Sequence, residues 1–328
     1  MSAEAAGAPD TATRWTDMTA ELKADQAHPQ SWYAVALASE LDREAVIGKD
    51  FLTTRVAIYR DETGKPVTLT ARCPHMGADL SLGDVVGDHL RCAYHHFCFD
   101  RSGDCASIPT EGPIPTAAKV FSFPTEERYG LIWAFNGPTP LFGPPEIRDY
   151  EEEDLLVNAR ATQIFTVAPW VNVANTVDFM HLRYVHGISY DFDMDTIEWV
   201  DDYHMEYAFE LDSPDFGKIE QRIRVCGPNT STHVTVAETR SAGIFTSTPV
   251  GTVSQSYYVA AVPKSEQTAG KDLHAQLAEQ EAFGDSLLED DARTLTGIRF
   301  QVGTFIQEDR AFARFLRWVH GLPTAQIE

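Results

Sequence analysis

Two short segments of this chain each carry one cysteine and one histidine a few residues apart. The first is a Cys-Pro-His run that contains Cys73 and His75, and the second is a Cys-Ala-Tyr-His run that contains Cys92 and His95. Thiolates and imidazoles are both good ligands for transition metals. One kind of [2Fe–2S] cluster needs two cysteines on one iron and two histidines on the other. These four residues are therefore predicted to bind a [2Fe–2S] cluster.

Two other interpretations of the same four residues are weaker. A structural zinc site usually groups its cysteines and its histidines, whereas the order here alternates between the two types. A chance arrangement would not explain the loop-forming residues near the motifs, such as Gly77, Gly83 and Gly103. Glycines allow backbone N–H groups to approach a ligand or a cluster closely. The pattern therefore favours the cluster over zinc and over chance.

A second group of possible metal ligands follows later in the chain. Asn175, Asp178 and His181 are spaced by three, so on an α-helix they would share one face. His186 comes five residues after His181, which overshoots a helical turn, and Gly187 indicates that the helix bulges or ends there. Two imidazoles and one carboxylate are the ligand set of an oxygen-activating, mononuclear non-haem iron. The alternative is a buried hydrogen-bond network, because the neighbouring residues are apolar.

The third ligand of such an iron has to be a carboxylate from elsewhere in the chain. Asp309 and Asp291 each share a predicted helix face with apolar residues. A carboxylate on an apolar face needs a partner, so both are candidates. The residue pattern alone does not separate them.

The motifs within residues 31–137 resemble the Rieske domain of the ring-hydroxylating type of oxygenase. The resemblance rests on the two cysteine–histidine motifs, on the segment 99–109 and on aromatic residues at both ends of the region. The chain departs from the family at His96 and Phe97, where the family usually has glycine and tryptophan. Histidine tolerates a left-handed backbone better than branched residues do. We therefore expect the loop to keep its shape and His95 to be the ligand.

The segment 175–186 is similar to the mononuclear iron motif of the same family. The resemblance implies that His181 and His186 bind the iron. It also implies that Asn175 contacts the iron ligands without binding the iron itself. It also implies that Asp178 is an electron bridge between subunits of a head-to-tail homotrimer. In that arrangement Asp178 accepts a hydrogen bond from His181 and reaches His95 of the next subunit.

The resemblance also bears on the third iron ligand. The segment 307–309 looks like the late iron-ligand segment of the family, so Asp309 is favoured and Asp291 is its rival. The short chain after Asp309 resembles the branch of the family that consists of α-only demethylases and hydroxylases.

The chain is predicted to have an α+β fold with two domains. Residues 1–30 are expected to be a mobile arm, residues 31–145 an all-β Rieske [2Fe–2S] domain and residues 146–328 the catalytic iron domain. Hairpin signals indicate the first domain, and Gly-Pro-rich residues near 137–145 indicate a linker. Strands bracketed by helices then indicate an α+β domain. The resemblance implies that this second domain is a helix-grip sheet over the iron.

Composition limits the partners and the compartment. The formal net charge of −23 argues against nucleic acid and against anionic membrane surfaces. No apolar stretch is long enough for a transmembrane helix, and the first residues do not resemble a signal peptide. The 5 cysteines have no regular spacing and do not indicate a disulfide framework. We therefore expect a cytoplasmic protein.

Together the two metal centres imply a terminal oxygenase that contains a Rieske [2Fe–2S] cluster and a mononuclear Fe(II), with O2 as co-substrate. It would hydroxylate a small organic, cyclic or aromatic substrate, or remove an O- or N-methyl group. A separate NAD(P)H-dependent reductase, a ferredoxin or both must supply electrons, because the sequence has no dinucleotide fingerprint. One alternative is an aromatic-ring dioxygenase that makes cis-diols. Another is a Rieske electron-transfer protein with an inactive second site.

Overall fold

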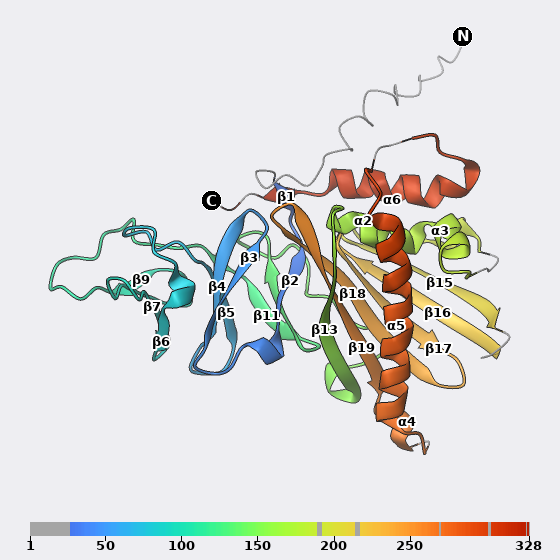
Figure 1. Cartoon of the computed structure of the whole chain (residues 1–328), viewed down its shortest axis with the longest axis horizontal. Helices are drawn as coiled ribbons and strands as arrows, with labels where there is room; N and C mark the ends of the chain where they lie inside the picture. Colours follow the sequence, from blue (N-terminus) through green and yellow to red (C-terminus); the bar gives the residue numbers. More distant parts are fainter. Residues whose placement is uncertain are drawn as a thin grey trace, which may run out of the picture.

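The computed structural model describes residues 27–188, 192–213, 217–268, 270–300, 303–325 and 327. An all-β part and a part with both helices and strands lie side by side along the long axis of the molecule (Figure 1). The predicted α+β class is confirmed. Most of the arm expected at 1–30 lies outside the described residues. Its last residues form β1 (His28–Pro29), which pairs with β20 (Thr324–Ala325) near the other end of the chain.

The all-β part contains three small antiparallel sheets. The hairpin signals of the sequence are confirmed, because Thr54–Arg60 pairs with Pro66–Thr70 across a short turn. Asp61 shapes the turn of this hairpin, because its carboxylate accepts hydrogen bonds from the backbone N–H groups of Thr63 and Lys65. The first sheet has the order β10 (Ser122–Phe123), β5 (Pro66–Thr70), β4 (Thr54–Arg60) and β3 (Val46–Phe51). The second has the order β11 (Thr125–Arg128), β12 (Leu131–Phe135) and β2 (Trp32–Leu37). The third has the order β6 (Asp84–Val86), β7 (His89–Arg91), β8 (Cys98–Phe99) and β9 (Cys105–Ser107).

A seven-stranded antiparallel sheet forms the other part. Its order is β13 (Leu155–Phe165), β19 (Val253–Pro263), β18 (Arg240–Val250), β17 (Thr230–Val236), β16 (Gly217–Cys226), β15 (His204–Ser213) and β14 (Glu198–Trp199). Alternation of apolar and polar residues predicts strands within 197–262, and β14, β15, β16, β17 and β19 lie there. The sequence did not indicate β13 or β18. The domain boundary expected at residues 145 and 146 falls in the connection between β12 and β13.

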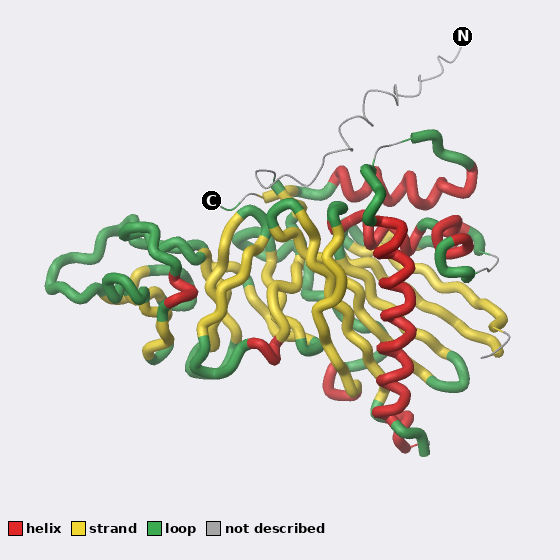
Figure 2. The backbone as a smooth tube through the Cα atoms, in the orientation of Figure 1, coloured by secondary structure: helices red, strands yellow, loops and turns green. Residues whose placement is uncertain are grey.

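A long helix, α5 (Leu273–Leu295), crosses one face of this sheet (Figure 2). Asp272 caps its first turn by accepting hydrogen bonds from the N–H groups of His274 and Ala275. Leucines spaced along one face of α5 pack on β19, which buries the apolar stripe. Gly284 allows the close approach, because a Cβ at this position would lie 2.4 Å from the ring of Tyr258.

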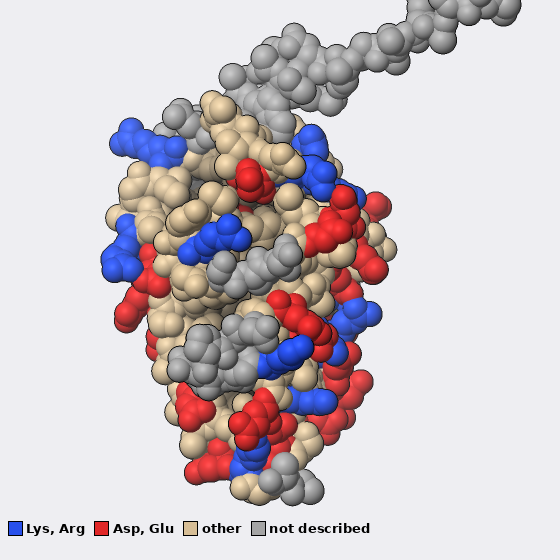
Figure 3. Space-filling view, turned by 90° about the vertical axis from the view of Figure 1, so that its right-hand side faces the viewer, with Lys and Arg blue, Asp and Glu red and all other residues tan. Residues whose placement is uncertain are grey.

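Shorter helices cover one end of the sheet and fill the connections. The α-helices are α2 (Pro169–Ala174), α3 (Phe179–Tyr184), α4 (Ser265–Thr268) and α6 (Arg310–Gly321). The 3-10 helices are η2 (Ala38–Glu40), η3 (Leu80–Leu82), η4 (Glu152–Asp154), η5 (Asn175–Val177), η6 (Met194–Thr196) and η7 (Gln307–Asp309). No helix among the described residues has both the length and the apolar character of a membrane span. Acidic and basic side chains are interspersed on the face at the α3 end (Figure 3).

The two parts of the chain share one hydrophobic core. Trp32, Trp133 and Phe135 of the second small sheet pack with Ile244 and Val259 of the large sheet. A core that spans the junction resists separation of the parts, since burial of apolar surface is the main stabilising term. The orientation of the β domain on the large sheet is therefore set by packing.

Buried hydrogen bonds fix the register of this junction. The hydroxyl of Thr248 in β18 donates to the carbonyl oxygen of Ala34 at 2.7 Å. Asn229 is fully buried, accepts a hydrogen bond from Ser31 at 2.7 Å and donates one to the carbonyl oxygen of Trp32 at 2.9 Å. Each bond satisfies a polar group that the junction removes from water.

Replacing Thr248 by valine should destabilise the protein without changing the volume of the side chain. The carbonyl of Ala34 would lose its buried donor, which we expect to cost about 1–3 kcal/mol. Urea unfolding followed by tryptophan fluorescence measures the difference. Thr116→Val, at an exposed loop position, should change stability by less than about 0.5 kcal/mol. An equally small effect of Thr248→Val would show that this bond does not hold the junction.

Candidate functional site

The four predicted cluster ligands come together between two loops of the β domain. Cys73 follows β5, and Cys92 follows β7. The two thiols are buried and lie close enough to interact, and the ring centroids of His75 and His95 are 4.6 Å apart. His75 is exposed and His95 is partly exposed. The structure therefore presents two thiols on the inner side and two imidazoles on the outer side of one site.

The two loops share one backbone pattern. The N–H group of Gly77 donates to the carbonyl oxygen of Cys73 at 2.8 Å, and the N–H group of His96 donates to that of Cys92 at 3.0 Å. Both donors have a left-handed backbone, with φ of 75° at Gly77 and 56° at His96. The expectation that His96 adopts the conformation usually taken by glycine is confirmed. The unusual residue therefore leaves the turn intact.

The side chain that follows His96 also has a defined role. The ring of Phe97 stacks on His75, with centroids 4.6 Å apart and an angle of 5° between the planes. This contact limits the rotation of the His75 ring, which lies at the exposed edge of the site. Phe97 thus holds the ring of a predicted cluster ligand in place.

The chemistry of the cysteines fits an iron–sulfur cluster. The backbone N–H groups of His75 and Met76 donate to the sulfur of Cys73. Burial and the neighbouring Cys92 raise the pKa of Cys73 to about 11. A buried thiolate pair is unfavourable without a cation, and bound iron supplies the positive charge that stabilises it. The residues at this site therefore fit the cluster.

The second group of ligands lies on a broken helical segment. α2 ends at Ala174, η5 follows, and Asp178 restarts the helix as the cap of α3. α3 ends at Tyr184, so His186 lies beyond the helix, as the spacing predicted. The break at Asp178 was not predicted. It changes the direction of the chain between Asn175 and His181.

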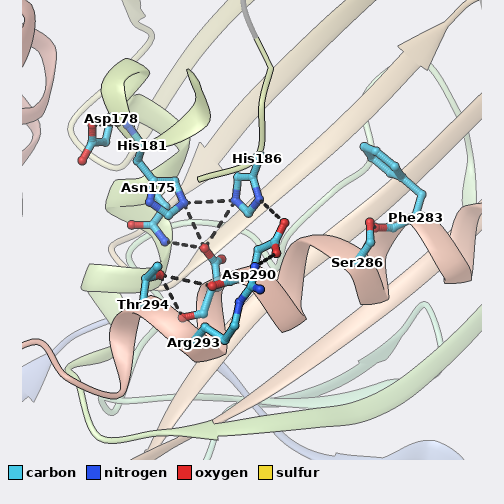
Figure 4. Close-up of polar contacts among 10 residues, drawn as sticks. Asn175, Asp178, His181, His186, Phe283, Ser286, Asp290, Arg293 and Thr294 are labelled. Carbon is cyan, nitrogen blue, oxygen red and sulfur yellow. Dashed lines mark hydrogen bonds and ion pairs between the residues drawn. The ribbon is translucent and has the colours of Figure 1, made fainter. Parts of the chain in front are cut away.

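Three of the candidate ligands converge at one point (Figure 4). Nε2 of His181 lies 3.0 Å from Nε2 of His186, and these atoms lie 2.9 Å and 3.3 Å from Oδ1 of Asp291. Ligand distances of about 2.1 Å at right angles place neighbouring donors about 3.0 Å apart. The three atoms therefore match one face of an octahedral metal site, and two imidazoles with one carboxylate suit non-haem iron.

The preference for Asp309 over Asp291 is wrong. The carboxylate of Asp309 accepts a hydrogen bond from the backbone N–H of Ile306 at 2.9 Å and does not belong to the histidine group. It lies in the turn that starts α6. Carboxylates are common in such turns because they satisfy free N–H groups. A local structural role therefore accounts for the position of Asp309.

The other predicted residues lie around the group with different roles. Asn175 donates to Oδ1 of Asp291 at 3.2 Å and so supports a ligand, as expected. Asp178 accepts a hydrogen bond from the backbone N–H of His181 at 2.9 Å rather than from its ring. Its carboxylate points away from the three ligand atoms (Figure 4). The expected orientation of the His181 ring by Asp178 is therefore not seen.

Sequence reasoning missed Asp290. Its Oδ2 lies 3.6 Å from Nδ1 of His186, a buried nitrogen without a hydrogen-bond partner among the described residues. A ligand histidine usually directs its second nitrogen at a carboxylate or a carbonyl. The signal in the sequence is the pair of adjacent aspartates at 290 and 291 on α5.

The electrostatics show how strongly these groups interact. Burial raises the pKa of Asp291, but the hydrogen bonds from His181 and His186 and their positive charges lower it by more. Burial lowers the pKa of His186, but Asp291 and Asp290 raise it by more. Asp291 and His186 thus stabilise each other's charged forms in a partly buried group. A divalent cation could take the place of the protons that this group shares.

The ligand group lies at one end of a cavity of about 1060 Å³. The cavity lies between the sheet and α5, and its lining includes His186 and Asp291. Phe209, Phe245 and Tyr258 contribute aromatic walls to it. A metal ion held by this group would face a largely apolar space that is partly open to solvent.

Comparisons with known proteins agree with this geometry. Residues 31–123 match the Rieske [2Fe-2S] domain family. The chain is 36% identical over 166 residues to the oxygenase component of dicamba O-demethylase from Stenotrophomonas maltophilia, covering 48% of this chain and 47% of that protein. It is 35% identical over 157 residues to the toluene-4-sulfonate monooxygenase system iron-sulfur subunit TsaM1 from Comamonas testosteroni, covering 47% and 45%. The chain thus matches about half the length of these relatives.

Solved structures extend the likeness of fold over most of the chain. Dicamba monooxygenase bound to dicamba superimposes with a TM-score of 0.62 and 23% identity, covering 89% of this chain and 96% of that chain. NdmB from Pseudomonas putida CBB5 superimposes with a TM-score of 0.70 and 21% identity, covering 88% and 89%. The chain therefore carries a segment that matches the Rieske [2Fe-2S] domain, and it has the fold of these two solved structures over most of its length.

Proposed function

We propose that this chain is the terminal oxygenase of a multicomponent system that hydroxylates, or removes an O- or N-methyl group from, a small organic molecule. The observation that carries the proposal is the convergence of His181, His186 and Asp291 at the end of a cavity, in a chain that also has a Rieske domain. Relatives are named as a toluene-4-sulfonate monooxygenase subunit, dicamba O-demethylase and chloroacetanilide N-alkylformylase. These names support monooxygenation or demethylation rather than ring dihydroxylation.

The two metal groups would be held by residues from different parts of the fold. Cys73 and Cys92 would bind one iron of the cluster, and His75 and His95 the other. His181, His186 and Asp291 would bind the mononuclear iron. When bound, the cluster supplies single electrons and the mononuclear iron supplies O2 activation.

His181, His186 and Asp291 form the triad of candidate iron ligands. Neighbouring residues hold these side chains in the orientation that metal binding requires. Asn175 holds the carboxylate of Asp291, and Asp290 lies behind His186. Groups that fix the orientation of metal ligands in this way maintain the affinity of the site. The walls of the cavity position one part of the substrate near the triad. The protein thus positions both the ligand side chains and the substrate.

Electron transfer requires a second copy of the chain in this proposal. The cluster loops and α3 lie at opposite ends of the molecule (Figure 1). A head-to-tail homotrimer would bring the cluster of one subunit to the triad of the next, with Asp178 beside His95 of that neighbour. Exposed apolar side chains near both ends support this arrangement, since such residues mark interaction surfaces. They include Met76, Tyr94 and Tyr184.

The remaining partner is an electron donor from outside the chain. We propose a separate NAD(P)H-dependent reductase, a ferredoxin or both, in the cytoplasm. All 5 cysteines are free thiols, which fits a compartment that keeps cluster ligands reduced.

Substitution of Asp291 tests the ligand assignment. Anaerobically purified protein should contain about three irons per chain, and Asp291→Ala should lower this to about two while the visible absorption of the cluster stays unchanged. Asp309→Ala should keep all of the iron. Metal analysis with acid-labile sulfide determination measures both. Loss of the third iron from Asp309→Ala but not from Asp291→Ala would contradict the assignment.

Isotope labelling tests the reaction class. With a surrogate NADH-dependent reductase and a screen of ring compounds, we expect one substrate to give a hydroxylated or demethylated product with coupled NADH use. Under ¹⁸O2 a hydroxylated product should carry one labelled oxygen, because the second oxygen atom leaves as water. Two labelled oxygens in the product would instead establish a dioxygenase.

A further inference from the structure

The cavity beside the triad contains polar groups for which the proposed iron chemistry has no use. One of them is His233, in the middle of β17, which lines the cavity. Its Nε2 lies 3.0 Å from the hydroxyl of Ser231, and its ring meets Phe245 edge to face with centroids 5.2 Å apart. Its Nδ1 has no hydrogen-bond partner among the described residues. One nitrogen is therefore held by the protein, and the other is available to a bound molecule.

His233 acts as a neutral group. Burial lowers the pKa of His233 to about 4. At neutral pH the imidazole is therefore uncharged, and it offers one donor and one acceptor. It can hold a hydroxyl or a carbonyl, but it does not provide a positive charge for an anion.

Gln276 on α5 provides a second polar group on the helical wall of the same cavity. Both polar atoms of its side chain, Oε1 and Nε2, are buried without a hydrogen-bond partner among the described residues. Asn172 also lines the cavity and has an unpaired buried Oδ1, although its amide nitrogen donates to Ser247 at 2.8 Å. Buried amides without partners are rare in native proteins because they cost free energy. Their presence here indicates that a ligand normally supplies the partner.

The cavity has no buried cation for an acidic ligand. Arg240 is the one Lys or Arg among its described lining residues, and this side chain is exposed at the start of β18, where its charge acts on Glu220. A carboxylate or sulfonate held by His233 and Gln276, rather than by the proposed iron, would be desolvated without a Lys or Arg as counter-charge, which is strongly unfavourable. The net charge of −23 would also repel anions that approach the protein.

The size of the cavity limits the ligand further. Ligand cavities commonly measure about 300–1,000 Å³, so a cavity of about 1060 Å³ has room for more than a single ring. Aromatic side chains, including Phe245, Tyr258 and Phe283, supply apolar walls. An extended apolar skeleton would fill this space better than a small polar molecule.

We propose that the cavity takes an uncharged, mainly apolar molecule of two or more rings, and that His233, with Gln276 on the helical wall, binds its hydroxyl or carbonyl oxygen. The proposal rests on the proposed function, because the triad lies in the same cavity. It assigns His233 and Gln276 as residues that determine substrate specificity. It also predicts that carboxylates and sulfonates bind poorly at His233 and Gln276.

Direct binding of three matched probes tests this proposal. The probes are 2-acetylnaphthalene, which is neutral and has a carbonyl, 2-naphthoate, which has a similar shape and is anionic, and 2-isopropylnaphthalene, which is apolar. Their fluorescence is titrated with the full-length protein at pH 7.5. We expect the ketone to bind about 5-fold more tightly than the apolar probe, from one or two hydrogen bonds. The anion should bind at least about 100-fold more weakly than the ketone.

Variants show whether His233 is responsible for the selectivity. His233→Phe keeps the ring and its apolar contacts, so it should reduce the preference for the ketone over 2-isopropylnaphthalene to less than about 2-fold. Binding of 2-isopropylnaphthalene itself should be retained, which also shows that the variant folds. Gln276→Leu should also weaken the binding of the ketone relative to 2-isopropylnaphthalene. His274→Phe, at an exposed position on α5, should leave all three affinities unchanged.

The proposal is overturned if 2-naphthoate binds as tightly as the ketone, if the ketone preference survives in His233→Phe, or if none of the three probes binds. Titration needs no electrons or O2, so its outcome is independent of turnover. Selective binding of the ketone without turnover of any substrate would refute the oxygenase function and leave the specificity assignment standing. Turnover of anionic substrates would refute the specificity assignment alone.

Discussion

The contact between one carboxylate and two imidazoles is the interaction on which the rest of this structure depends. Asp291 is brought to His181 and His186 by α5, whose position on the sheet is set by independent contacts. Its leucines pack on β19, Gly284 lets the helix approach Tyr258, and Arg160 of β13 pairs with Asp285 at 2.7 Å. A small sideways shift of α5 would separate the ligands, because metal sites tolerate little error in ligand position. The fold of the large sheet therefore positions the three candidate ligands.

The cluster site is built on a different principle. Its ligands lie in two tight turns, each closed by its own backbone hydrogen bond and by a residue with positive φ. Such turns need little support from distant parts of the chain. The shared core at the junction then fixes the β domain on the large sheet, with the cluster at the far end of the molecule (Figure 1). Since the parts are packed together, a hinge motion that brings the two sites of one chain together would require the core to open.

The placements that sequence reasoning anticipated are those that depend on residues close in sequence. The cluster motifs, the left-handed His96 and the break before His186 all follow from local chemistry. The choice between Asp291 and Asp309 does not follow from local chemistry, because both residues share a predicted helix face with apolar residues. The distinction depends on a tertiary contact: Asn175 and Asp291 meet although they are 116 positions apart.

Polar residues on the sheet were harder still to interpret. In the second half of β17, His233 and Thr235 alternate with Val234 and Val236, a pattern that is typical of a strand with one face in water. Here the face that carries His233 and Thr235 lines the cavity. Alternating polar and apolar residues indicate that the two faces of a strand have different surroundings. The alternation does not indicate whether the polar face contacts solvent or a ligand. The strand β18 was missed for a related reason, since its glycine and proline weaken the pattern.

The central claim is that electrons pass from the cluster of one chain to the iron of another. Mixing subunits tests it most directly. A chain without a cluster, Cys92→Ser or His95→Asn, and a chain without the third iron, Asp291→Ala, should each be inactive alone. Co-assembled in equal amounts in a head-to-tail ring, they should recover about a quarter of the wild-type activity, since about a quarter of the junctions join an intact cluster to an intact iron site. No recovered activity in mixed oligomers confirmed by native mass spectrometry would contradict the account.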